Sequence, residues 1–140
     1  MTDPRILHPT PENIEKAARL IKSGALVAFP TETVYGLGAN GFDNAACRAI
    51  YTAKGRPSDN PLILHIPEAS GLSALCREIP AKAYKLCETF TPGPLTLVLK
   101  KTAAVPDAVS AGLDTVAVRI PSHPVARALL FTAGVPIAAP

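Results

Sequence analysis

The sequence has few cysteines, and they form no pattern that points to a metal site or a disulfide framework. Cys47, Cys76 and Cys87 are odd in number, and none stands in a C-x-x-C motif. A structural zinc site needs closely spaced ligands, and a disulfide-stapled domain needs paired cysteines. Neither class is indicated, and we expect reduced, mostly buried thiols in a cytoplasmic protein.

Long apolar stretches are also missing. No run approaches the roughly 18–20 apolar residues that cross a bilayer. The N-terminal segment MTDPRILHPTPEN lacks the apolar core of a signal peptide. The sequence therefore indicates neither a membrane span nor a signal peptide.

Motifs for covalent and metal-based chemistry are absent as well. The loop at residues 31–38 has no Walker pattern G-x-x-x-x-G-K-[ST], no Ser-His-Asp or Cys-His set stands out, and no metal-ligand spacing is present. We therefore expect no protein-bound metal. What remains is a chemistry of binding and positioning, in which two substrates are held together and phosphate charge is stabilised.

The composition is typical of one folded domain. The chain has 140 residues, of which 48% are hydrophobic and 18% charged. A formal net charge of +3 permits an anionic partner but does not require nucleic acid, because a few local cations can serve a nucleotide.

Helical and extended patterns alternate along the chain. Thr10 and Pro11 predict the start of a helix that ends at Gly24, and Asp43 predicts the cap of a second helix that ends before Gly55. Further helices are predicted at residues 68–77, 80–90, 106–111 (one turn) and 123–133 (capped by Ser122), and strands at residues 25–29, 61–66, 95–99, 115–120 and 135–139. Alternating strands and helices predict an α/β domain.

A hydroxyl-rich segment, residues 31–38, follows the first predicted strand. Thr31 and Thr33 can face the same side of an extended chain, and Gly36 and Gly38 permit tight turns and close approach of a ligand. Glu32 is the only acid there and could position a metal or an amine. The alternative is an ordinary turn made of polar residues.

A compact basic cluster, residues 54–57, follows about twenty residues later. Lys54 and Arg56 flank Gly55 at a predicted helix end, with Asn60 close by. Cations at a helix C-terminus are favoured by the helix dipole alone, so a solvated helix end is one interpretation. The other is a phosphate clamp of one point charge and one forked donor.

Two further residues end predicted strands. His65 closes the run PLILH, where a lone histidine is more often a structural hydrogen-bonding residue than a ligand or a base. Arg119 closes TVAVR, at the carboxyl end of a strand, where α/β sheets bind ligands. It could meet a carboxylate or a phosphate, or form a surface ion pair.

Four segments in this order resemble the YrdC-type threonylcarbamoyl-AMP synthases: FPTETVYGLGA, KGRPSDNPLILH, TPGPLTLVL, and VAVRIP with a closing PIAAP. The resemblance covers residues 11–140, so we expect residues 1–10 to be a tail and residues 11–140 a YrdC-like domain. It implies a twisted, open, mixed α/β sheet flanked by helices, with a positively charged concave face. It also implies a nucleotidyltransferase that makes L-threonylcarbamoyladenylate from L-threonine, bicarbonate and ATP and releases pyrophosphate.

The resemblance assigns roles residue by residue. It implies that L-threonine is bound by Thr33, His65 and Arg119, and that ATP is bound by Lys54, Arg56, Asn60 and Thr115. Mg²⁺ would accompany ATP without a dedicated protein cage. The product would feed threonylcarbamoyl modification of adenosine beside the tRNA anticodon, through downstream threonylcarbamoyl-transferase machinery.

The family pattern continues with a Ser-x-Asn element directly after the position of Pro140. We therefore expect the domain to be incomplete at its C-terminus and the chain to be a truncation or a fragment. Two other functions are compatible with parts of this pattern: the related domain of hydrogenase-maturation carbamoyltransferases, and a non-catalytic module that binds double-stranded RNA or tRNA. The first is disfavoured because no C-x-x-C zinc-finger segment precedes the motifs, and the second because the net charge is small.

Overall fold

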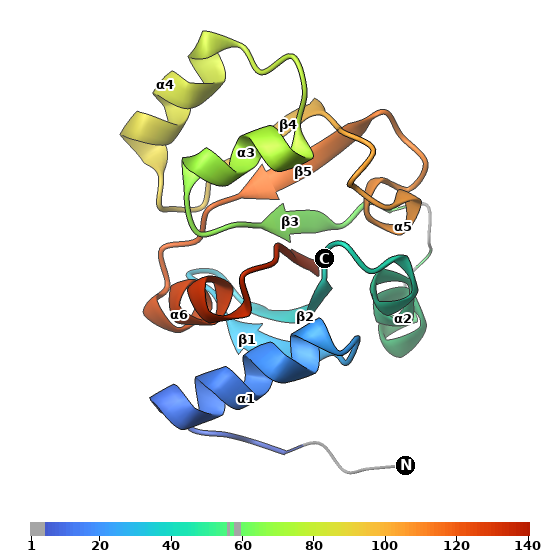
Figure 1. Ribbon diagram of the computed structural model, residues 1–140, viewed down its shortest axis with the longest axis vertical. Helices are drawn as coiled ribbons and strands as arrows, with labels where there is room; N and C mark the ends of the chain where they lie inside the picture. Colours follow the sequence, from blue (N-terminus) through green and yellow to red (C-terminus); the bar gives the residue numbers. More distant parts are fainter. Residues whose placement is uncertain (1–4, 56, 58–59) are drawn as a thin grey trace.

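A six-stranded mixed sheet organises the protein (Figure 1). The computed structural model describes residues 5–55, 57 and 60–140. The strand order is β1-β2-β6-β3-β5-β4, in which β3 and β5 are parallel and all other neighbours antiparallel. The strands are β1 (Val27–Pro30), β2 (Tyr35–Asn40), β3 (Ile63–His65), β4 (Thr96–Lys100), β5 (Thr115–Arg119) and β6 (Ile137–Ala139). The predicted mixed, open α/β sheet is confirmed.

The helices begin and end largely where the capping residues predict. Thr10 Oγ1 accepts a hydrogen bond from the Asn13 N–H at 3.2 Å, Asp43 Oδ1 accepts one from the Ala46 N–H at 3.1 Å, and Gly55 ends its helix at φ 62°. The helices are α1 (Pro11–Lys22), α2 (Asn44–Lys54), α3 (Leu72–Leu75), α4 (Ala81–Phe90), α5 (Asp107–Ser110) and α6 (Pro124–Ala133), with a 3₁₀ turn η1 (Ala69–Gly71) before α3. In the described part of the chain, none of these helices has the length and apolar character needed to cross a membrane.

Three sequence-based expectations about elements were wrong. Residues 35–40, taken in part as a loop, form β2, because pairing with β1 compensates for the low strand propensity of their glycines. His123, not Ser122, caps α6: its Nδ1 accepts from the Val125 N–H at 3.1 Å. The helix expected at residues 68–77 is only η1 and α3, because Cys76 turns into an extended bridge to Lys101.

Two apolar clusters lie on opposite faces of the sheet. Alternation along β6 shows this directly, because Ala138 joins the cluster under α2, α3, α4 and α5, whereas Ile137 and Ala139 join the cluster under α1 and α6. Val116 and Val118 of β5 face the first cluster. The second cluster, with Phe29 of β1, covers only the β1–β2–β6 half of its face.

The other half of that face is open to solvent. It carries the outward side chains of β3, β5 and β4, and Val98 there is 64% exposed. The strand register places these residues opposite one another: Ile63 and Val98 pair with Ala117, and Thr96 pairs with Arg119. We call this surface, made of Ile63, Thr96, Val98, Thr115, Ala117 and Arg119, the open face.

Three glycines have the G-x-G-x-x-G spacing of a dinucleotide-binding turn, namely Gly36, Gly38 and Gly41. Gly36 and Gly38 lie inside the antiparallel strand β2, so they form no phosphate-binding loop. A Cβ on Gly38 would lie 2.6 Å from Ile137 Cγ2 and 2.7 Å from Phe29 Cε1. Here the glycine spacing serves close packing of the strand against the second cluster.

We expect Gly38→Ala to destabilise the fold by about 1–3 kcal/mol, because the added methyl group overpacks a buried contact. Gly36→Ala is the matched control on the same strand, since its Cβ would meet its neighbours at 3.4–3.5 Å, an ordinary contact distance. Denaturant unfolding of both variants measures the difference. Equal free energies of unfolding for the two variants would contradict this account of β2.

Candidate functional site

His65 and Arg119 lie side by side at the carboxyl ends of the parallel strands β3 and β5. The register pairs them directly, and the Ile66 N–H donates to the Arg119 carbonyl at 3.0 Å. On its other side, His65 is paired with Ile137 of β6. Two residues that are far apart in sequence thus meet at one edge of the sheet.

His65 is a buried, neutral imidazole. The residue is only 3% exposed, and its Nδ1 lies 3.1 Å from the Ile137 carbonyl oxygen. Burial, reinforced by the positive charge of Arg119, lowers the pKa of His65 from 6.5 to about 4. Because a carbonyl only accepts, Nδ1 carries the proton and Nε2 is left with a lone pair.

The Arg119 guanidinium is held by a cross-strand hydroxyl. Its Nε and Nη2 both donate to Thr96 Oγ1, at 2.9 and 2.8 Å. Within the described part of the chain, Nη1 donates to no other group and Arg119 forms no ion pair, so the surface ion pair weighed from the sequence is not found there. The guanidinium therefore keeps donors for an anionic ligand.

Thr33 lies in the turn between β1 and β2, and its side chain is exposed. The preceding residue, Glu32, is half-buried. The turn is closed by Thr31, whose Oγ1 accepts from the Val34 N–H at 3.2 Å and lies 3.3 Å from Thr33 Oγ1. The Glu32 carboxylate reaches to Ser122 and His123 and is near enough to Arg119 for the two charges to interact. The turn is thereby held near the His65–Arg119 end of the sheet.

The remaining predicted residues lie toward the opposite ends of β3 and β5. Lys54 is the last residue of α2 and is exposed, Asn60 precedes β3, and Thr115 opens β5. Just before β3 the chain is held by α5 instead of β5, because the Leu62 N–H donates to the Val109 carbonyl at 2.9 Å. Arg56, also predicted for this group, lies outside the described residues.

Thr115 and Arg119 point to the same face of β5 because they are four residues apart. At the rise of a strand this separates them by about 13 Å along the open face. The predicted site thus divides into two ends, one with His65 and Arg119 and one with Thr115 and Asn60. An elongated ligand with an anionic group at each end would match this spacing.

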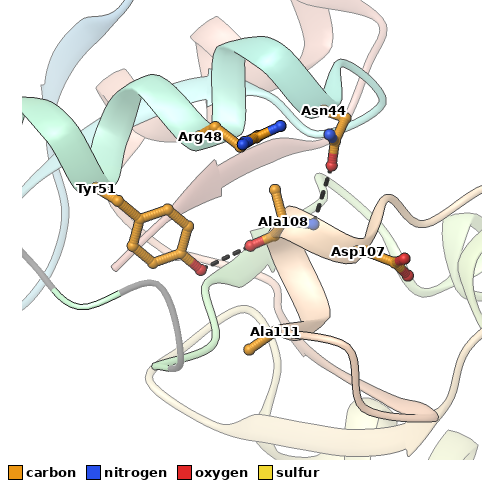
Figure 2. Close-up of a pocket in the computed structure, with 6 residues that line it drawn as sticks. All are labelled: Asn44, Arg48, Tyr51, Asp107, Ala108 and Ala111. Carbon is orange, nitrogen blue, oxygen red and sulfur yellow. Dashed lines mark hydrogen bonds between the residues drawn. The ribbon is translucent and has the colours of Figure 1, made fainter.

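A separate pocket of about 360 Å³ lies between α2 and α5 (Figure 2). None of the predicted site residues lines it. Tyr51 Oη donates to the Ala108 carbonyl at 2.6 Å and lies 3.0 Å from the Asn60 carbonyl oxygen, and Asn44 Oδ1 accepts from the Ala108 N–H at 3.0 Å. These contacts place the backbone of Asn60 beside α2 and α5. The pocket therefore lies next to the backbone of one predicted ATP-binding residue.

The side chains that support the site were not found from the sequence. Thr96 and Tyr51 occupy ordinary positions on a strand and on the apolar face of a helix, so only their partners reveal a role. Glu32 was noted as the only acid in its segment, but its link to Ser122 was not expected. The described residues contain no group of three His, Cys, Asp or Glu side chains suited to a metal ion, and the cysteines are free and buried as expected.

Comparison with known proteins gives a consistent result. The Sua5/YciO/YrdC family model, described as "Telomere recombination", matches residues 19–140. A threonylcarbamoyl-AMP synthase of Pyrococcus abyssi is 56% identical over 127 residues, which cover 91% of this chain and 37% of that protein. One of Bacillus subtilis is 55% identical over 128 residues, with the same coverage of 91% and 37%.

A solved structure also matches the fold of this chain closely. The crystal structure of P. abyssi Sua5 complexed with L-threonine superposes with a TM-score of 0.92 at 53% identity, covering 98% of this chain and 39% of that one. The chain therefore spans about 37% of the length of the curated relatives named above.

We expect stability to fall as the pH decreases from 6.5 toward 4, because the folded protein resists protonation of His65, which the unfolded chain accepts near 6.5. This contribution to stability is fully present above the unfolded pKa and is lost between the two values. Denaturant unfolding across this interval should show a shallower loss for His65→Gln, which keeps a donor for Ile137 but does not titrate. An NMR titration midpoint of the imidazole near 6.5 would contradict the burial argument.

Proposed function

The chain belongs to the Sua5/YciO/YrdC family, and from that premise we propose that it carries the substrate-binding surface of an L-threonylcarbamoyladenylate synthase. The substrates would be L-threonine, bicarbonate and ATP, and the products L-threonylcarbamoyl-AMP and pyrophosphate. The observation that carries this proposal is the open face, with Arg119 beside His65 at one end and the Thr115 hydroxyl at the other.

L-Threonine would bind at the end formed by Thr33, His65 and Arg119. The free donors of Arg119 suit the α-carboxylate of an amino acid, and Thr96 fixes the plane in which they point. The lone pair on His65 Nε2 can accept from a substrate hydroxyl or amine. The L-threonine in the P. abyssi Sua5 crystal structure supports this choice of amino acid.

ATP would bind at the other end, where Lys54, Asn60 and Thr115 offer a point charge, an amide and a hydroxyl. Arg56 completes the Lys-x-Arg element that the sequence resemblance assigns to the phosphates. Mg²⁺ would enter with ATP, held mainly by phosphate oxygens, because this ion is usually bound through few protein groups.

The reaction needs orientation and charge stabilisation, without a covalent nucleophile. The threonine nitrogen would attack bicarbonate, forming a carbamate with loss of water. A carbamate oxygen would then attack the α-phosphorus of ATP, as the bond from that phosphorus to the bridging oxygen breaks and pyrophosphate leaves. Cations beside the phosphates favour this step by stabilising the charge that develops on the leaving group.

In the cell, the adenylate would be consumed by the machinery that transfers the threonylcarbamoyl group to tRNA, and we propose a cytoplasmic location for both steps. The direct test is release of pyrophosphate from ATP by the purified protein. We expect release to require both L-threonine and bicarbonate. Release that is indifferent to L-threonine would overturn the proposed function.

The alternative, a module that binds double-stranded RNA or tRNA, has weaker support from the charges. Three cations around β4 already have acidic partners: Arg77 pairs with Asp114, Lys100 with Glu78 and Lys101 with Asp107. Cations neutralised in this way release fewer counterions on binding RNA. A filter-binding titration at low and moderate salt would favour this role only if affinity were high and fell steeply with salt.

The two ends of the site should respond separately to substitution. Lys54→Ala should weaken ATP binding by about tenfold while leaving L-threonine binding unchanged, because one charged donor to phosphate is lost. Arg119→Lys should do the reverse, because lysine keeps the charge but loses the fork that fits a carboxylate. Isothermal titration with each substrate measures both effects.

Lys22→Ala is the matched control for Lys54→Ala. Both lysines lie in the last turn of a helix and are exposed, but Lys22 ends α1, which packs on the covered half of the sheet. Lys22→Ala should leave both affinities unchanged. Equal losses of ATP affinity in the two lysine variants would count against the phosphate-binding role of Lys54.

A further inference from the structure

We propose that Glu32 is a positioning residue for the L-threonine end of the site, where it holds the turn that carries Thr33 against the segment that follows Arg119. The inference rests on the proposed function, because it names the residue that aligns two of the proposed threonine-binding groups. No step of the reaction is assigned to Glu32 itself.

The carboxylate of Glu32 joins parts of the chain that are about ninety residues apart. Its Oε2 accepts from the backbone N–H groups of Ser122 and His123, at 3.1 and 3.3 Å, and lies 3.5 Å from Ser122 Oγ. Ser122 follows Arg119 by three residues and precedes α6. The negative charge thus lies at the start of a ten-residue helix, where the helix dipole stabilises it.

The turn itself cannot supply this alignment. Its other hydrogen bonds lie among Thr31, Thr33 and Val34. Thr31 donates to the Val34 carbonyl through both its Oγ1 and its backbone N–H, the latter at 3.2 Å. These bonds fix the shape of the turn. Among the hydrogen bonds of the described residues, only those of Glu32 connect residues 31–34 with residues 122–123.

Charge adds to the effect of the hydrogen bonds. Arg119 and Glu32 interact electrostatically, and both also act on His65 in opposite senses. A carboxylate at this place therefore balances the positive charge of Arg119 before an anionic substrate arrives.

A role as general base fits Glu32 less well. Burial raises the pKa of this carboxyl, but backbone N–H groups of Glu32, Ser122 and His123, together with Arg119, outweigh burial and lower it below the ordinary 4.5. A carboxylate that holds its charge this firmly accepts a proton from a substrate amine poorly. Its other oxygen, Oε1, is buried and has no partner among the described residues, so the anchoring falls on Oε2.

The test compares Glu32→Ala and Glu32→Gln with the exposed control Glu15→Gln, which removes the acid of a surface pair with Arg19 on α1. Binding of L-threonine and of ATP is measured separately, with hydrogen exchange of the amides at residues 31–34 and 122–123. Glutamine keeps an acceptor for the two N–H groups but lacks the charge, so it serves as the conservative variant if Glu32→Ala fails to fold.

We expect Glu32→Ala to weaken L-threonine binding by about tenfold or more, with ATP affinity within about twofold, since charge-assisted hydrogen bonds are lost at one end of the site. Glu32→Gln should fall between Glu32→Ala and the unchanged control. Exchange should become faster at Ser122 and His123 in both Glu32 variants.

The outcomes separate this proposal from the proposed function. If the unsubstituted protein binds no L-threonine, the proposed function fails, and with it the role of Glu32 in that site. If the unsubstituted protein binds L-threonine and Glu32→Ala binds it equally well, only the positioning role is overturned. Equal losses for L-threonine and ATP would likewise overturn it, since they indicate a general loss of structure.

Discussion

The parallel pairing of β3 with β5 is the constraint on which the site depends. It is the one parallel pair among the strands that the structure describes, and its register sets His65 beside Arg119. A shift by one residue would turn Arg119 and Thr115 toward the apolar cluster under α3, α4 and α5, and would expose Val116 and Val118. Burial of those valines therefore also determines that the polar residues of β5 face solvent.

Within the described residues, apolar clusters cover one face of the sheet fully and the other only in part. Helices α1 and α6 cover β1, β2 and β6, but among residues 5–55, 57 and 60–140 no comparable apolar cluster covers the open face over β3, β5 and β4, as the exposure of Val98 indicates. The supporting contacts come from elsewhere: Thr96 on the neighbouring strand orients Arg119, and Glu32 ties a distant turn to the same end. Of the groups proposed to bind substrate, His65, Arg119 and Thr115 lie at strand ends, whereas Thr33 lies in a turn and Lys54 ends α2.

Much of the architecture could be predicted from local signals. Thr10 and Asp43 cap their helices through side-chain hydrogen bonds, and the apolar runs around residues 63–65 and 115–119 form strands, because capping and burial patterns act within a few residues. The prediction of residues 35–40 as part of a loop was wrong because glycine is a poor strand former unless a neighbouring strand pairs with it. Gly38 is needed there because Phe29 and Ile137 leave no room for a side chain.

The sequence by itself determined the α/β class, the residue types at the proposed site and the resemblance to a family, since these depend on composition, spacing and motif order. Only the tertiary structure decided which of those residues meet. Three contacts join residues from distant parts of the chain: His65 pairs with Arg119, Thr96 Oγ1 accepts a hydrogen bond from Arg119, and Glu32 accepts one from the Ser122 N–H. The low pKa of His65 likewise depends on its burial in the folded sheet. Such contacts follow from strand register and burial, which no single segment specifies, because both are properties of the assembled sheet.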